Sequence, residues 1–170
     1  MNQLTLAFEA TECNGWPSLR FCIDHDIQQE ITFSGPSAVV TLDIDLLDGV
    51  HELEIERYAK TNNNVVFVDN KILQDQLVTL TDIYVDDVKL PDMFKYSGTF
   101  YYHDQAVKSG TIWGPNGKYI WSFETPLLNW LISQRKKGSD TVVDLFNPDN
   151  TQQLLNDLAK FKSIINDQQN

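Results

Sequence analysis

The chain has 170 residues, of which 42% are hydrophobic, which is enough for one sizeable core or a core with a small appended unit. Its net charge is -11, and 17 of its 24 Asp and Glu lie in residues 1–92. Such an acidic surface repels phosphate backbones and anionic lipid, and no apolar run reaches membrane length, so neither nucleic acid nor a membrane is expected as a partner.

Short runs of alternating apolar and polar residues predict β-strands over the first half of the chain. These runs lie at residues 4–8, 19–23, 27–33, 41–46, 51–56, 65–68 and 77–85, and an aromatic segment follows at 94–102. Turn residues such as Gly, Pro, Asn and Asp separate them. This rhythm is typical of an antiparallel β-sandwich, so the predicted fold is mainly β, of the jelly-roll kind.

The clearest of these patterns predicts a β-hairpin. Residues 41–46 and 51–56 flank an Asp48-Gly49 turn, and their period of two gives each strand one apolar face. The residues expected on the buried face are Leu42, Ile44, Leu46, Leu53 and Ile55. Those expected toward water are Asp43, Asp45, Glu52, Glu54 and Glu56. Carboxylates in this arrangement indicate a solvated sheet surface.

The C-terminal part of the sequence changes character. Residues 113–119 contain Asn-Gly, which predicts a tight turn between short strands. Thr125 and Pro126 are suited to begin a helix, with Thr125 as the cap, and Gly138 is suited to end it. We therefore expect a β-sandwich domain with an aromatic-rich hairpin over residues 1–124 and a helical extension over 125–170.

A second helix is predicted over residues 151–166. Its apolar positions recur at spacings of four, three and four, which gives one stripe made of Leu154, Leu158, Phe161 and Ile165. The stripe must cover something: the domain's own sheet, another copy of the chain, or a different protein. About two heptads are too few for an isolated coiled coil, so a partner would have to offer a preformed surface.

No catalytic arrangement is recognisable in the sequence. His25, His51 and His103 are far apart and have no metal-ligand spacing, and there is no Gly-x-Ser-x-Gly motif. The paired carboxylates alternate with apolar residues on strands, where they are expected to stay ionised. The prediction is a protein that is not an enzyme.

Two further features bear on the chain's compartment. Cys13 and Cys22 are nine residues apart and are expected as free thiols, with a bridge across neighbouring strands as the alternative. The N-terminal residues have neither the basic start nor the apolar stretch of a signal peptide. Export by the general secretory route is therefore not expected.

Two kinds of ligand suit the loops. Asn64, Asp69 and Asp75 offer oxygens of the kind that calcium prefers, although Asn and Asp are also ordinary turn residues. Aromatic side chains cover the apolar faces of sugar rings, which makes Trp16, Tyr58 and Trp113 candidate glycan contacts. Trp16 and Trp113 lie in Gly/Pro loops and are expected to be exposed, whereas packing in the core is the alternative.

Part of the sequence resembles the calcium-dependent xylan-binding class of carbohydrate-binding modules. The likeness covers residues 2–90 and rests on Trp16-Pro17-x-Leu19-x-Phe21-x-Ile23-Asp24, on Leu47-Asp48-Gly49-Val50-His51-Glu52-Leu53-Glu54-Ile55, and on Asp75-Gln76-Leu77 before Ile83-Tyr84-Val85-Asp86. It implies a jelly-roll sandwich with calcium ligands near Asp69 and Asp75. Where that family has Asp-Arg-Asn, this chain has Asp75-Gln76-Leu77.

The whole chain also resembles small uncharacterised proteins of tailed phages, through segments such as Trp113-Gly114-Pro115-Asn116-Gly117 and Pro126-Leu127-x-x-Trp130-Leu131-Ile132. That resemblance implies a virion component made in the host cytoplasm and released by lysis. The leading hypothesis is a non-catalytic structural or accessory virion protein that docks through its C-terminal extension onto other virion proteins or itself. The alternative is a calcium-dependent carbohydrate-binding module that recognises a cell-surface or plant-type glycan.

Overall fold

The computed structural model describes residues 2–107 and 110–138. The chain divides into two compact units, residues 1–128 and 129–170. The predicted helix with Leu154, Leu158, Phe161 and Ile165 lies outside the described residues, so docking through it stays a prediction. Among the residues that the structure describes, none of the helices has the length and hydrophobicity needed to span a bilayer.

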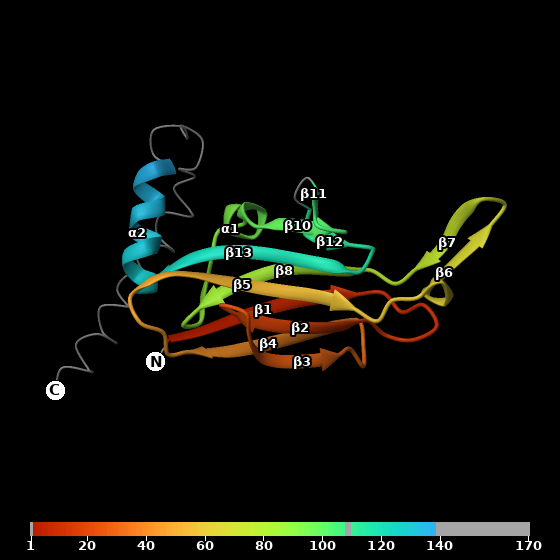
Figure 1. The fold of residues 1–170 in the computed structure, drawn as a ribbon, viewed down its shortest axis with the longest axis horizontal. Helices are drawn as coiled ribbons and strands as arrows, with labels where there is room; N and C mark the ends of the chain where they lie inside the picture. The colour runs from red at the N-terminus through yellow and green to blue at the C-terminus, as the bar shows by residue number, and fades with distance from the viewer. Residues whose placement is uncertain (1, 108–109, 139–170) are drawn as a thin grey trace. The chain divides into compact units, whose positions relative to one another are not determined.

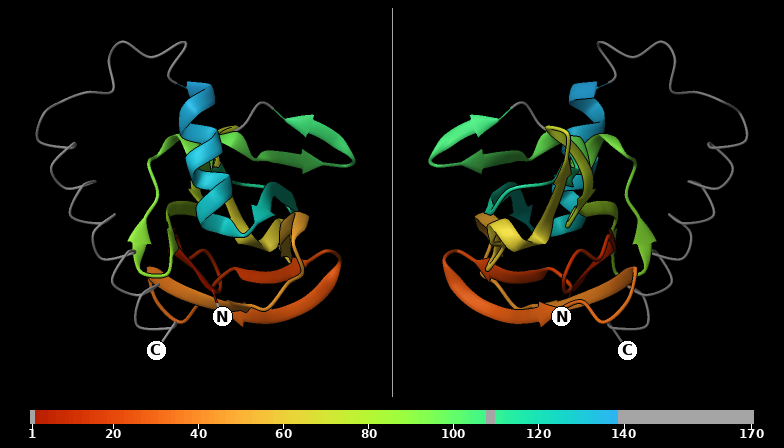
Figure 2. Two further views of the ribbon diagram at one scale, coloured as in Figure 1. Left: turned by 90° about the vertical axis from the view of Figure 1, so that its left-hand side faces the viewer. Right: turned by 90° about the vertical axis from the view of Figure 1, so that its right-hand side faces the viewer.

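The first unit is an antiparallel β-sandwich, as predicted (Figure 1; Figure 2 shows the ends). Sheet A has the order β12-β8-β1-β4, with β9 beside β8, and sheet B has the order β11-β10-β13-β5-β2-β3. The strands of sheet A are β1 (Asn2–Ala10), β4 (Ser37–Ile44), β8 (Val78–Val85), β9 (Val88–Lys89) and β12 (Ile112–Trp113). Those of sheet B are β2 (Ser18–Ile23), β3 (Asp26–Thr32), β5 (Gly49–Tyr58), β10 (Thr99–Tyr102), β11 (Gln105–Val107) and β13 (Gly117–Thr125).

The remaining elements are short. A 3-10 turn, η1 (Asn62–Asn64), leads into a separate hairpin of β6 (Val65–Val68) and β7 (Lys71–Asp75). Helix α1 (Met93–Ser97) precedes β10. Helix α2 (Leu127–Gly138) corresponds to the predicted helix after Pro126. Thr125 was expected to cap that helix, but it is the last residue of β13 and its hydroxyl donates to the Leu47 carbonyl.

The core lies between the inward rows of the two sheets. Leu4, Leu6 and Phe8 of β1 are at most 1% exposed, as the alternating pattern predicts. The row of β2 (Leu19, Phe21, Ile23) faces them from sheet B and is also buried. The two cysteines are free and buried, and burial, followed by the Glu54 carboxylate, raises the pKa of the Cys22 thiol.

The hairpin predicted around Asp48-Gly49 is wrong. Strand β4 pairs with β1 in sheet A, whereas β5 pairs with β13 and β2 in sheet B. Residues 45–48 therefore carry the chain from one sheet to the other. The apolar positions are nevertheless buried as expected, apart from the half-buried Leu46, because both strands face the same core from opposite sides. Alternation identifies the inward face of a strand and says nothing about its neighbour.

The structure also differs from the sequence-based expectation at two other segments. Residues 93–97 form α1, and only residues 99–102 form a strand. The helix begins directly after Pro91 and Asp92, and it places the side chain of Phe94 in the core. The segment around Asn116-Gly117 does not close a hairpin either. Strand β12 belongs to sheet A and β13 to sheet B, so this turn also connects the sheets.

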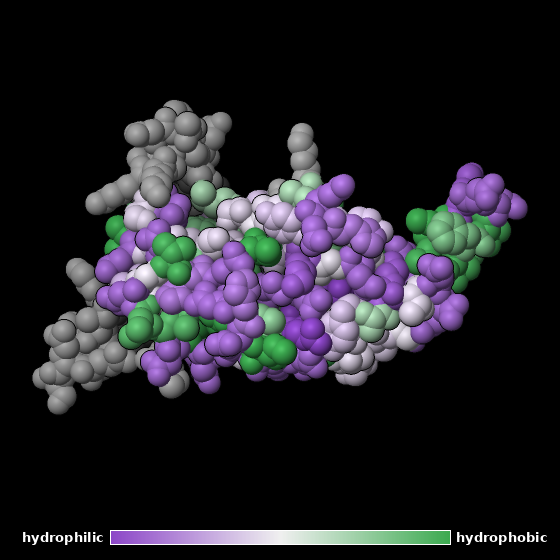
Figure 3. Space-filling view, in the orientation of Figure 1, coloured by the Kyte–Doolittle hydropathy of each residue, from purple (hydrophilic) through white to green (hydrophobic). Residues whose placement is uncertain are grey.

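The β6–β7 hairpin projects from the end of the sandwich and carries apolar residues into solvent (Figures 1 and 3). Its turn consists of Asp69 and Asn70, with φ of 50° and 60°, which suits a two-residue hairpin turn. Phe67 is 63% exposed and Leu73 is 68% exposed. Val68 and Ile72 are exposed as well.

Candidate functional site

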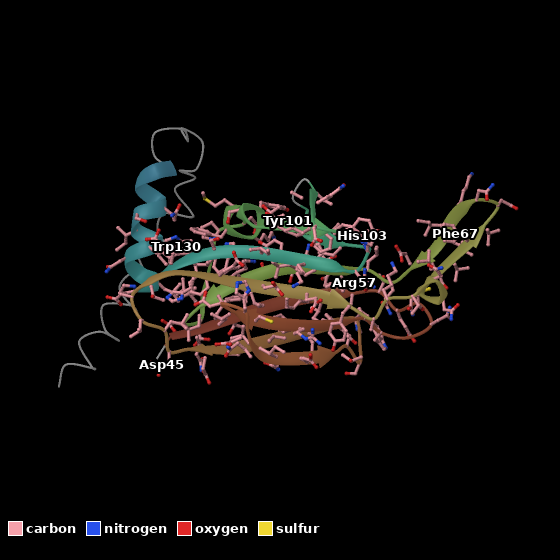
Figure 4. All side chains as sticks on the ribbon, in the orientation of Figure 1. Asp45, Arg57, Phe67, Tyr101, His103 and Trp130 are labelled. Atoms are coloured by element: carbon pink, nitrogen blue, oxygen red, sulfur yellow. The ribbon has the colours of Figure 1, made fainter. Side chains whose placement is uncertain are left out.

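A cleft of about 810 Å³ lies where the ends of β5, β10 and β13 meet the neighbouring loops. Figure 4 labels three of its residues, Arg57, Tyr101 and His103, near the end of the sandwich from which the β6–β7 hairpin projects. Its walls come from residues 56–62 after and at the end of β5, from residues 101–104 at the end of β10, and from residues 114–118 at the start of β13. The cleft is thus built from segments that are far apart in the sequence.

Three tyrosines line the cleft. Tyr58 is the last residue of β5, and Tyr101 and Tyr102 close β10. Tyr102 is 41% exposed, and its ring centroid lies 4.2 Å from that of His103. The Arg20 guanidinium sits 5.0 Å from the centroid of the Tyr58 ring, so it covers one face of that ring. Three tyrosines therefore contribute to the lining of the cleft, and Arg20 and His103 lie against two of their rings.

Charges in the cleft are balanced, in contrast to the chain as a whole. Its lining has three cations, Arg57, Lys60 and Lys118, and three carboxylates, Glu56, Asp75 and Asp104. Lys118 donates to Glu54 at 2.9 Å, and this contact raises the pKa of the lysine. The whole chain has a net charge of -11, whereas the charges of the cleft lining balance. The lining itself therefore produces no strong local field that would select an anionic or a cationic ligand.

Arg57 forms the floor of the cleft and is 1% exposed. Its guanidinium donates to the backbone carbonyls of Trp113 (3.0 Å) and Gln76 (2.5 Å) and to Gln76 Oε1 (3.1 Å). Burial lowers the pKa of Arg57 to about 10, against the opposing effect of the Asp75 charge. Arg57 is therefore still a cation at neutral pH, and it ties β5 to the loops on either side.

Lys60 fixes the loop that follows β5. Its backbone N–H donates to Asn116 Oδ1, and Asn116 Nδ2 donates back to the Lys60 carbonyl, both at 2.9 Å. Its ammonium donates to Asp75, to the Gly114 carbonyl at 2.7 Å and to the Gln76 carbonyl at 3.2 Å. One residue thus connects three segments that line the cleft or lie beside it.

Of the predicted glycan contacts, Tyr58 alone lines the cleft. Trp16 is half-buried in the loop between β1 and β2. The expectation that Trp113 is exposed is wrong, since it is 1% exposed and its ring stacks on Phe100 with centroids 5.7 Å apart. The Gly and Pro that follow Trp113 form the turn, while Trp113 itself ends β12 on the inward face.

The structure does not bring the three predicted calcium ligands together. Asp69 lies at the tip of the β6–β7 hairpin, whereas Asp75 lies at its base, where it pairs with Val65. The Asn64 side chain is engaged, because Oδ1 accepts from Thr61 N–H and Nδ2 donates to the Cys13 carbonyl. Within the described residues, no group of three or more His, Cys, Asp or Glu could hold a metal ion.

Several cleft residues were missed by sequence reasoning: Lys60, Tyr101, Tyr102, Asn116 and Lys118. The run Phe100-Tyr101-Tyr102 contained a usable signal, because adjacent residues of a strand point to opposite faces and one tyrosine had to point away from the core. Asn116 and Lys60 gave no local signal. Their contact joins residues 56 positions apart.

A second cluster joins the connection between the sheets to sheet B. His51 Nδ1 lies 2.6 Å from Asp24 Oδ2, and His51 Nε2 lies 2.8 Å from the Leu47 carbonyl. The hydrogen bond to Asp24 raises the pKa of His51 and lowers that of Asp24. Thr125 Oγ1 lies 3.1 Å from the imidazole but donates to the Leu47 carbonyl, so this hydroxyl is already hydrogen-bonded and is not a free nucleophile. We call this hydrogen-bonded group of Asp24, Leu47, His51 and Thr125 the latch.

Comparison with known proteins gives two distant likenesses. No family model matches the chain, and no curated protein matches it. A solved structure described as vCBM60 in complex with galactobiose is 13% identical, with a TM-score of 0.48, covering 70% of this chain and 96% of that one. A second structure of vCBM60 is 15% identical, with a TM-score of 0.47, covering 71% and 90%. That second structure is described as belonging to one of two families of calcium-dependent carbohydrate binding modules.

Proposed function

We propose that this chain is a non-catalytic carbohydrate-binding domain that takes a neutral glycan in the cleft at the end of the sandwich. The observation that carries the proposal is the grouping of Tyr58, Tyr101 and Tyr102 around a cleft whose charged residues balance. Tyrosine rings provide apolar faces for the C–H faces of sugars, and their hydroxyls can bond to sugar hydroxyls.

The polar residues of the cleft suit the same class of ligand. Asn62, His103 and Asp104 offer donors and acceptors beside the tyrosines. The volume of about 810 Å³ falls within the range of roughly 300–1,000 Å³ that small-molecule sites occupy. A ligand with many hydroxyls and no charge uses both features and is not disfavoured by the acidic surface outside the cleft.

Binding is proposed in preference to hydrolysis because of how the cleft's carboxylates are engaged. Glu56 accepts from Arg20 at 2.8 Å, and Asp75 accepts from Lys60. A glycosidase needs two carboxyl groups facing one scissile bond, one of them protonated. Here two of the three carboxylates are instead held by cations of the protein.

The test is a screen of neutral and charged oligosaccharides, followed by calorimetric titration of the best ligand. Replacing both Tyr101 and Tyr102 with Ala should weaken binding about 10-fold or more, because each aromatic contact contributes on the order of 1 kcal/mol. Tyr96→Ala is the matched control, since Tyr96 is 51% exposed on α1 and does not line the cleft. Equal weakening by both variants, or no neutral ligand in the screen, would contradict the proposal.

The virion role predicted from the sequence remains a separate hypothesis. It requires the stripe of Leu154, Leu158, Phe161 and Ile165 to be buried by a partner, and these residues lie outside the described part of the chain. Light scattering of the full chain and of Leu158→Asp tests it. Assembly through the extension would be supported if the wild type is a defined oligomer and Leu158→Asp is a folded monomer.

A further inference from the structure

The Lys60 ammonium lies among oxygens of the kinds that bind calcium. Its three acceptors are the Asp75 carboxylate at the end of β7, the Gln76 carbonyl at 3.2 Å and the Gly114 carbonyl at 2.7 Å. The side chains of Lys60 and Asp75 are 10% and 17% exposed, so the pair is largely removed from water. A carboxylate with converging backbone carbonyls is also the ligand set that a calcium ion uses.

The number and charge of these groups favour an ammonium over a divalent ion. A lysine ammonium has three N–H donors, and three acceptors receive them here. Arg57, whose Nη2 shares the Gln76 carbonyl, places a second cation at the same point. Two cations already face the single carboxylate Asp75, so a calcium ion added there would meet net repulsion in a partly buried setting.

We infer that the Lys60 ammonium takes the structural place of a metal ion in ordering the loops of the cleft, and that the cleft forms without calcium. Lys60 holds the loop after β5 through its backbone and reaches the base of the β6–β7 hairpin and the loop before β13 through its side chain. The residues therefore do not fit the calcium site expected from the sequence. This inference concerns loop order and stands whichever ligand the cleft takes.

The first test is thermal unfolding of the full chain in EDTA and in millimolar calcium chloride. The Tm of the wild-type protein should be the same in both. A Tm that rises with calcium in the wild type but not in Asp75→Asn would overturn the inference, because it would place an ion at Asp75. This readout does not involve glycan binding, so its failure is distinct from failure of the proposed function.

The second test removes the ammonium while keeping the aliphatic stem. Lys60→Met leaves Asp75 without its hydrogen-bonded cation, with only Arg57 nearby, and should lower Tm by roughly 10 °C, as breaking a largely buried pair in a chain of this size does. Lys89→Met is the matched control, since Lys89 pairs with Asp82 outside the cleft and is 53% exposed. Unchanged Tm in Lys60→Met, or a loss no larger than in the control, would overturn the inference. If Lys60→Met does not fold, the calcium comparison on the wild type decides alone.

Discussion

The side-chain amide of Asn116 bonds both backbone polar groups of Lys60, accepting from its N–H and donating to its carbonyl at 2.9 Å each. The arrangement resembles the paired hydrogen bonds of an antiparallel sheet, although one partner is a side chain. It joins the loop after β5 to the loop before β13. The walls of the cleft are therefore linked by a contact that a single substitution removes.

Asn116→Ala should destabilise the protein by about 1–3 kcal/mol, since two hydrogen bonds of about 0.5–1.5 kcal/mol each are lost. Asn116→Asp keeps the acceptor for the Lys60 N–H and loses the donor, so it should lie between wild type and Asn116→Ala. Urea unfolding at neutral pH measures both. Wild-type stability in Asn116→Ala would show that the contact is not formed in solution.

The His51–Asp24 pair predicts a dependence of stability on pH. The pKa of His51 is raised from its ordinary 6.5, mainly by the hydrogen bond to Asp24, so its contribution is full below about 6.5 and is lost as pH rises through the raised value. The pKa of Asp24 is lowered from 3.8, mainly by His51, so its contribution is present above 3.8 and is lost as pH falls through the lowered value. The pair should stabilise most between about pH 4 and 6.5.

Thermal unfolding of the wild type and of His51→Gln from pH 4 to 9 tests this dependence. The difference in Tm between the two proteins should be largest near pH 5 and should shrink on the alkaline side. His103→Asn replaces a histidine at an exposed turn outside the latch and serves as the control for the loss of an imidazole elsewhere in the chain. A constant difference for His51→Gln would mean that the pair is not ionised in the way described.

Gly117 is predicted to be intolerant of any side chain. A Cβ at this position would lie 2.4 Å from the Tyr101 carbonyl oxygen and 2.7 Å from the Phe100 ring. Gly117→Ala must therefore push β10 away from β13, at a cost of about 1–3 kcal/mol, and should shift the tyrosine wall of the cleft. Gly35→Ala is the control, because nothing lies within 4 Å of the added atom. Chemical denaturation compares the two variants, and equal stabilities would contradict the packing described here.

The apolar tip of the β6–β7 hairpin should contribute little to stability. Phe67→Ser and Leu73→Ser change side chains that are already 63% and 68% exposed, so each should alter the free energy of unfolding by about 0.5 kcal/mol or less. Leu80→Ala in the core should cost about 2–5 kcal/mol. Retention on a hydrophobic-interaction column should fall in the two tip variants. A loss of stability near that of Leu80→Ala would mean that the tip is buried in solution.

The sequence was sufficient to predict the local half of this fold. Inward rows such as Leu4, Leu6 and Phe8 follow from a period of two, which is a property of one strand alone. The partners of β4 and β5 were not predictable in this way, because either sheet can receive the same apolar face. The β6 strand at residues 65–68 was located correctly, whereas its projection into solvent depends on the absence of a covering layer in the described residues.

The candidate site was less predictable than the fold, for the same reason. Trp113 and Tyr101 are both aromatic residues in short strands, yet one is buried against Phe100 and the other lines the cleft. What separates them is the face of the strand on which each lies: Trp113 is on the inward face of β12, whereas Tyr101 follows the buried Phe100 and lies on the opposite face of β10. Lys60 and Asn116 meet only because β5 and β13 are neighbours, and no pattern within either segment announces that pairing.

Within the described residues, β6 and β7 pair with each other and with no third strand. Each strand therefore has one backbone edge whose N–H and C=O groups face solvent, next to exposed Phe67 and Leu73. An extended segment of any chain could add to such an edge without disturbing the sandwich core. On this ground, concentrated or warmed samples should begin to associate at the hairpin while the sandwich is still folded.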